Sequence, residues 1–259
     1  MKHILFLIFL VSVSVVSAQQ IPHGVCPVGL SDRQTDGFHS AVKQCTETIF
    51  EVEVERDLEK KGAQTSCIEL IYDENGNVQS RRTFDSDGHK LTGTLYQYRD
   101  GKKYVATTRD ANGKRTLQTL YEQNDSNNLC TLMRMTDAIA ITISTMRVRH
   151  EKNYVRTTET YHDGEVINTD YYFNKNGTLR TICKDGDVAQ TITLSYGFKP
   201  LAMIKKQFLP TRKIILENGQ AKVYQYQYEV DVYGEWTKRT TFSNGKAIEI
   251  AERVIEYWQ

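Results

Sequence analysis

Oxygen-bearing side chains surround a glycine in Tyr72–Asn77 (YDENGN), and carboxylate and amide oxygens are the ligands that Ca²⁺ prefers. An EF-hand loop needs an aspartate in its first place, a glycine in its sixth and a glutamate in its twelfth. With Gly76 in the sixth place, Ile71 and Arg82 fall in the first and twelfth, and neither can bind a cation. The stretch is therefore predicted to be a β-turn, because Asp, Asn and Gly are the residues that turns require.

Catalytic constellations are not apparent. The sequence contains no nucleophile elbow, HExxH motif, dinucleotide fingerprint or P-loop. The histidines after residue 18 stand at no metal-ligand spacing from one another: His23, His39, His89, His150 and His162. Paired acids such as Glu51 and Glu53 could serve a glycoside hydrolase, but they lie on the polar face of a predicted strand, where charge protects sheet edges. No catalytic residue, metal ligand or cofactor is predicted.

Tyrosines are the best candidates for binding. Tyr224, Tyr226 and Tyr228 have the same parity, and Tyr96 and Tyr98 repeat the spacing. An exposed row of such rings could stack on sugars or anchor a protein interface. The alternative is that the rings pack against neighbouring strands as the buried face of the sheet. These five residues are the possible partner-binding aromatics.

Strands must position these side chains. Apolar and polar residues alternate in Lys222–Val232 (KVYQYQYEVDV), Ile49–Arg56 (IFEVEVER) and Ala138–Met146 (AIAITISTM). Such period-2 alternation predicts strands with one wet face, and hence an antiparallel sheet. The best helical candidate is Asp36–Cys45, which runs directly into a strand pattern.

Turn signals separate the strands at regular intervals. Nine of the ten are Asn-Gly or Asp-Gly, which favour the type I′ hairpin turn. The ten glycines are Gly76, Gly88, Gly101, Gly113, Gly164, Gly177, Gly186, Gly219, Gly234 and Gly245. The first four are 12, 13 and 12 residues apart, which leaves room for one strand and one turn in each interval. The fold class is predicted to be all-β, an antiparallel meander or stacked β-hairpin array forming an extended or curved sheet.

The chain divides into three parts. Residues 1–18 read as a signal peptide, with Lys2, an apolar run and a small-residue cleavage site before Gln19. Residues 19–40 form an N-terminal segment, and residues 41–259 form the β-repeat domain. A polar stretch near 123–130 (QNDSNNLC) is a possible internal break. The protein is expected to be exported to the periplasm, the cell surface or the medium, with no transmembrane span after cleavage.

Charge and cysteines limit the partners. Removing Lys2 with the signal lowers the formal charge from +1 to zero, which argues against nucleic acid as the partner. Export would permit disulfides, but the spacing leaves their pairing open. The cysteines are Cys26, Cys45, Cys67, Cys130 and Cys183.

Short motifs suggest a family. They are Ala41–Glu55, Tyr72–Asn77, Thr83–His89, Tyr233–Lys246 and Glu252–Tyr257. This pattern resembles the exported YD-repeat (RHS-like) proteins of Bacteroidetes and, more distantly, MORN-like repeat proteins. The resemblance implies β-repeat architecture and export, and it identifies no catalytic residues.

The leading functional hypothesis is an exported non-enzymatic β-repeat protein of the cell envelope or secretome. It would act as a binding or structural module for an envelope protein or a glycan, and exposed sheet edges could allow self-association. The alternatives are a secreted glycan-active hydrolase with unidentified acidic residues, or an immunity or antitoxin-like protein.

Overall fold

The computed structural model describes residues 31–55, 58–123, 130–151, 154–175, 178–185, 190–198 and 208–259. The predicted signal peptide and Cys26 lie outside these residues. A short helix, α1 (Asp32–Thr35), precedes sixteen strands. The strands are β1 (Val42–Glu55), β2 (Leu58–Tyr72), β3 (Val78–Phe84), β4 (Lys90–Arg99), β5 (Lys102–Asp110), β6 (Arg115–Gln123), β7 (Cys130–Asp137), β8 (Thr142–His150), β9 (Tyr154–Tyr161), β10 (Val166–Phe173), β11 (Leu179–Lys184), β12 (Gln190–Phe198), β13 (Phe208–Glu217), β14 (Gln220–Val230), β15 (Trp236–Ser243) and β16 (Lys246–Tyr257).

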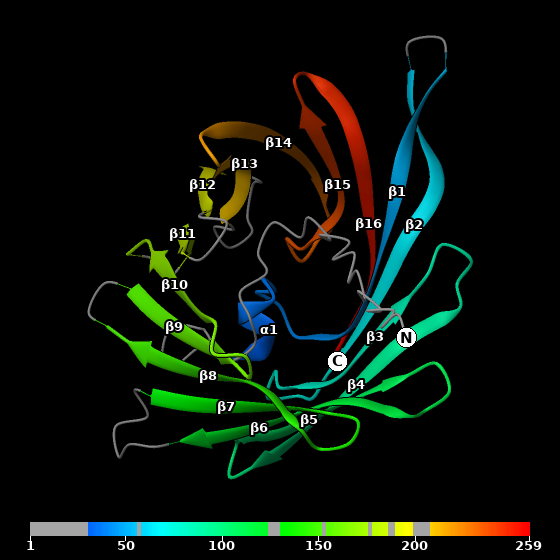
Figure 1. The fold of residues 1–259 in the computed structure, drawn as a ribbon. Helices are drawn as coiled ribbons and strands as arrows, with labels where there is room; N and C mark the ends of the chain where they lie inside the picture. The colour runs from blue at the N-terminus through cyan, green and yellow to red at the C-terminus, as the bar shows by residue number, and fades with distance from the viewer. Residues whose placement is uncertain are drawn as a thin grey trace, which may run out of the picture.

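The strands form a closed barrel (Figure 1). Each strand pairs antiparallel with its neighbours in the chain, and β1 pairs with β16 from Val42–Tyr257 to Phe50–Ile250. The predicted antiparallel meander is confirmed, but the predicted extended or curved sheet is wrong. Twist accumulates across a long meander, and the β1–β16 ladder satisfies the backbone groups that an open sheet would expose. Closure therefore removes the edges expected to allow self-association.

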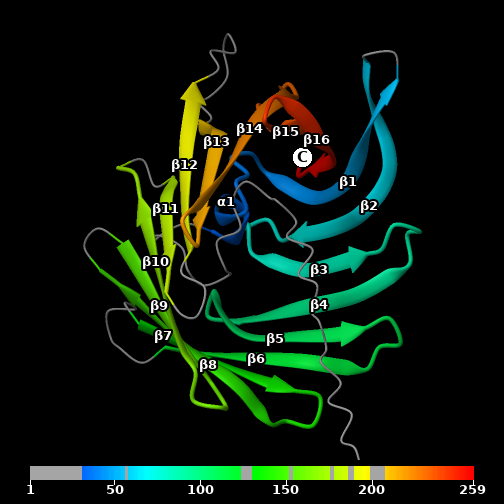
Figure 2. The same ribbon diagram turned by 45° about the horizontal axis from the view of Figure 1, so that its top comes forward.

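The two faces of the barrel differ in polarity. On β14, Tyr226 and Tyr228 are buried inside, whereas Gln225, Gln227 and Glu229 are exposed outside. Figures 1 and 2 show α1 within the ring of strands, which identifies the inner face. Buried residues form three clusters. The first lies on β8–β12, the second joins β1–β5 to the N-terminal segment, and the third lies on β1 and β14–β16.

Outward side chains form ion pairs across neighbouring strands. These pairs are Glu69–Arg82 (2.8 Å), Arg156–Asp170 (2.7 Å) and Glu229–Lys238 (2.8 Å). Near residues 123–130, the flanking strands β6 and β7 pair directly with each other. No helix among the described residues is long and apolar enough to cross a membrane.

The turns adopt two backbone conformations. Asp100-Gly101, Asn218-Gly219 and Asn244-Gly245 have positive φ at both residues, which confirms the type I′ expectation there. YDENGN behaves differently, because Gly76 has a φ of 85° while Asn75 does not have a positive φ. Gly76 N–H donates to the Asp73 carbonyl, and the Asn77 N–H donates to the Asp73 carboxylate at 2.8 Å.

This second pattern recurs in the turns that begin at Asp85, Asp110 and Asp231. Each has a β-turn that ends in a left-handed glycine, and an aspartate that accepts backbone N–H groups. The type I′ prediction is wrong at Asn75-Gly76, Asp87-Gly88 and Asn112-Gly113, since the longer loop needs positive φ only at the glycine. The carboxylates thus fold the turns, as the turn interpretation of YDENGN requires.

Candidate functional site

The five candidate tyrosines lie inside the barrel. Tyr96, Tyr226 and Tyr228 are only 9%, 5% and 7% exposed, and Tyr98 and Tyr224 pack against the same inner clusters. The Tyr228 ring meets Trp236 edge-on, with centroids 6.0 Å apart. Burial outweighs the nearby arginine charge and raises the pKa of Tyr96 to about 12. At these positions the rings are packed in the core, which leaves no exposed platform there.

The N-terminal segment enters the barrel as α1. Ser31 caps the helix through a capping box with Gln34, and Gly37 follows with a φ of 87°. The helical candidate Asp36–Cys45 was therefore wrong: the helix lies earlier, and β1 has begun at Val42. The missed signal was the Ser31-x-x-Gln34 spacing, which marks a helix start.

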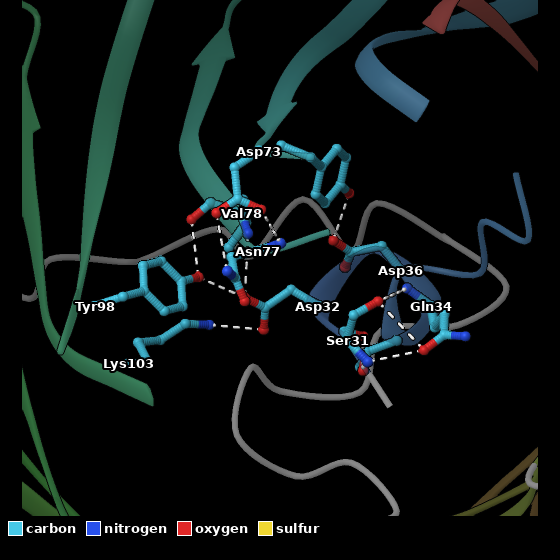
Figure 3. Close-up of polar contacts among 11 residues, drawn as sticks. Ser31, Asp32, Gln34, Asp36, Asp73, Asn77, Val78, Tyr98 and Lys103 are labelled. Carbon is cyan, nitrogen blue, oxygen red and sulfur yellow. Dashed lines mark hydrogen bonds and ion pairs between the residues drawn. The ribbon is translucent and has the colours of Figure 1, made fainter. Parts of the chain in front are cut away.

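Asp32 fastens this helix to the barrel wall (Figure 3). Its carboxylate lies 3.0 Å from Lys103 Nζ and accepts hydrogen bonds from the Tyr98 hydroxyl and the Val78 N–H. Lys103 Nζ also lies 4.8 Å from the centroid of the Tyr96 ring. Burial, and then the Asp32 charge, raise the pKa of Tyr98 well above its usual value. Sequence reasoning missed Asp32 and Lys103 because they are 71 residues apart.

The rest of the segment contacts β2 and the turn between β14 and β15. Asp36 accepts a hydrogen bond of 2.6 Å from the Tyr72 hydroxyl, and Phe38, which is fully buried, meets the Tyr72 ring edge-on. The Glu235 carboxylate, in the β14–β15 turn, accepts from the His39 N–H at 2.7 Å and from the next backbone N–H at 2.6 Å. Contacts on β2–β5 and on the β14–β15 turn thus hold the segment as a plug, defined as residues 31–41.

A buried ionic network lies next to the plug. Arg253 makes two contacts of 2.9 Å with the Glu47 carboxylate, and Arg239 lies 3.0 Å from Glu249 and 4.0 Å from Glu47. Burial alone would raise the pKa of Glu47, but the Arg253 and Arg239 charges outweigh it and hold that pKa below its usual value. The Arg253 guanidinium lies 4.7 Å from the Phe38 ring centroid, so the network touches the plug.

The remaining candidates are on the surface or are free thiols. Glu51 and Glu53 are both exposed on β1. Asp85, Asp87 and His89 bring possible ligand atoms within 4.8 Å of one another, but Asp85 already accepts the N–H groups of Asp87 and His89 in its turn. The free thiols among the described residues are Cys45, Cys67 and Cys183. The side chain of Cys130 lies outside the described part of the chain.

Together, the geometry defines a closed antiparallel barrel whose own N-terminal segment plugs one end. No family model and no curated protein matches the chain. It is similar to a porin-like protein from Bacteroides vulgatus, at 10% identity over 84% of this chain and 98% of that one, with a TM-score of 0.46. A porin-like protein from Bacteroides uniformis matches at 11% identity over 84% and 97%, with a TM-score of 0.38. The Tc holotoxin pore of Photorhabdus luminescens matches at 10% identity over 80% of this chain and 16% of that one, with a TM-score of 0.21. The closed barrel is shown by the strand pairing of this chain itself.

Proposed function

We propose that this protein is an exported, non-enzymatic β-barrel module that works by binding a partner through its outer wall. The observation that carries the proposal is the use of the lumen: Tyr72, Tyr98 and Lys103 of the inner wall bind carboxylates of the chain's own residues 31–41. A lumen end filled in this way is structural, so a partner meets the outer wall. An envelope glycan or protein is the expected class of partner.

The polarity of the outer wall supports a barrel in water. A membrane barrel carries an apolar band outside and a polar interior, and an arginine or lysine facing lipid costs about 2–4 kcal/mol at the bilayer centre. Here Arg147, Arg156 and Lys238 face outward, and the interior contains three apolar clusters beside the Glu47–Arg253 network. The signal-like residues 1–18 support export, and the recurring Asp-x-x-Gly turns are in keeping with the YD-repeat resemblance.

The carboxylates of the ionic network are committed to ion pairs. A glycoside hydrolase needs two carboxyl groups that can act on one bond. Glu47 and Glu249 instead share Arg239 at 4.0 and 3.0 Å, and Glu47 also holds Arg253. These contacts favour a structural role for both groups and support a binding protein over the hydrolase alternative.

The proposal is tested with purified residues 19–259. The protein is screened against neutral and acidic polysaccharides by affinity electrophoresis, and against an envelope fraction by pull-down. Each glycan sample is also assayed for new reducing ends. We expect the protein to retain a defined partner and to produce no new reducing ends. New reducing ends produced by the native protein, but not by a denatured sample, would contradict the non-enzymatic role. Export predicts a mature N-terminus at Gln19, whereas an uncleaved chain in the inner membrane would refute it.

A further inference from the structure

The outer wall has a polar groove on three adjacent strands. The groove has a volume of about 400 Å³ and lies on β8, β9 and β10. Its lining residues are Thr145, Arg147, Arg149, Arg156, Thr158, Thr160 and Asn168. Val148, Val155 and Tyr171 are buried on the inner face of these strands. The register of β8, β9 and β10 places all seven lining residues on the other face, so they point away from the core.

The groove concentrates positive charge. Arg149 and Arg156 are directly opposite each other across β8 and β9, and like charges in that relation destabilise a sheet. Asp170 binds Arg156 through two contacts of 2.7 Å. Arg147 and Arg149 are exposed, and among the described residues no carboxylate lies within ion-pair distance of either. The lining contains three guanidinium groups and no acid, so a bound anion would relieve the repulsion.

One side of the groove is held in place by hydrogen bonds. The Thr158 hydroxyl donates to the Asn168 side-chain oxygen at 2.8 Å. Asn168 donates in turn from its backbone N–H and its side-chain amide to the Asp185 carboxylate, at 2.6 and 3.2 Å. These contacts order the amide and hydroxyl groups before a ligand arrives, which lowers the entropy that binding would lose.

Two tyrosines extend the groove along the same face. Tyr154 and Tyr172 are opposite each other in register, two residues from Arg156 and Asp170 on their respective strands. Their ring centroids are 5.3 Å apart with an interplanar angle of 31°, and the Arg156 guanidinium lies 5.6 Å from the Tyr154 ring. Both rings are partly exposed, so aromatic faces adjoin the arginines on the outer wall.

We propose that this groove binds an acidic glycan. Arginine pairs with carboxylate or sulfate groups through two parallel hydrogen bonds, hydroxyl and amide groups match sugar hydroxyls, and exposed tyrosines offer amphipathic faces to sugar rings. An acidic peptide would use the arginines but not the combination of ordered hydroxyls and aromatic faces. The inference rests on the proposed binding function and names its ligand as a chain that carries uronate or sulfate groups.

The test measures binding of residues 19–259 to polygalacturonate, dextran sulfate, neutral dextran and poly-glutamate by calorimetry at two salt concentrations. The variant Arg147→Gln/Arg149→Gln is compared with Arg82→Gln/Arg212→Gln, which removes the same charge from exposed outer positions on β3 and β13. Circular dichroism and thermal melts establish that both variants fold. Wild type is expected to bind at least one acidic glycan, more weakly at higher salt, and the groove variant at least tenfold more weakly than the control.

Each alternative result has a definite meaning. An equal loss of glycan affinity in the two variants would show that the groove is not the binding site. Glycan binding by the wild type would still support the proposed function. Binding of poly-glutamate as tightly as of polygalacturonate would overturn the glycan class. Failure of the wild type to bind any of the four polymers would overturn this inference. Failure in the envelope pull-down as well would also remove the proposed function.

Discussion

Replacing Glu47 with glutamine tests the buried network most directly. Arg253 makes two charge-assisted contacts of 2.9 Å with the Glu47 carboxylate, and such bonds contribute about 1.5–3 kcal/mol each. Glutamine keeps one oxygen that can accept, but it leaves the Arg253 and Arg239 side chains, which are 7% and 0% exposed, without the carboxylate charge that they share. Removing one partner of a buried pair costs about 3–5 kcal/mol. We therefore expect Glu47→Gln to lower the free energy of unfolding by about 3 kcal/mol at pH 7.

The assay is urea denaturation of residues 19–259, with the midpoint and the slope fitted separately. Glu69→Gln is the matched control, because Glu69 pairs with the half-exposed Arg82 on the outer wall at 2.8 Å. A surface pair of this kind contributes under about 1 kcal/mol. If the two variants differed by less than about 1 kcal/mol, the network would not stabilise the barrel as the geometry indicates.

The pH dependence of the stability difference between wild type and Glu47→Gln gives a second check. The folded-state pKa of Glu47 is below its usual value, so ionised Glu47 stabilises the fold above the unfolded pKa, about 4.3. That contribution is lost as the pH falls through the lower folded-state pKa. The difference between wild type and Glu47→Gln should thus be largest near pH 7 and shrink on acidification below about pH 4. A constant difference from pH 7 to pH 3 would refute the charge-based explanation.

Two further pairs of variants probe the turns and the plug. A Cβ at Gly76 would lie 2.9 Å from Ser31 Oγ, whereas one at Gly88 would meet no atom within 4 Å. Both glycines have positive φ, so alanine should destabilise each, with Gly76→Ala the worse by about 1 kcal/mol or more; equal thermal shifts would contradict this contact. Tyr226→Phe removes a buried hydroxyl that has no hydrogen-bond partner among the described residues and should leave the unfolding free energy unchanged or slightly higher. Tyr98→Phe breaks the hydrogen bond to the plug and should cost about 1–3 kcal/mol and increase hydrogen exchange at residues 31–41; protection as strong as in the wild type would contradict the plug contact.

Local pattern was sufficient for most strands. The predicted strand Ala138–Met146 was wrong at its start, because β7 ends at Asp137, β8 begins at Thr142, and Ala140 in the turn between them has a φ of 68°. The alternation in KVYQYQYEVDV placed its tyrosines on one face and its glutamines on the other, as β14 shows. That parity could not say which face would be covered, and the candidate tyrosines proved to line the interior. The partly exposed aromatic pair, Tyr154 and Tyr172, was missed because its two members are on different strands and meet only through the β9–β10 register.

Side-chain alternation and glycine act within a few residues, so the sequence alone predicts most of the strand content, the antiparallel order and the glycine turns. The closure of the sheet, the plug at one end and the position of Arg149 opposite Arg156 emerge only in the folded barrel. The buried pair Glu47–Arg253 joins residues 206 positions apart. Such contacts depend on the register of β1 against β16 and on sheet twist summed over the whole barrel, and no local pattern contains either quantity.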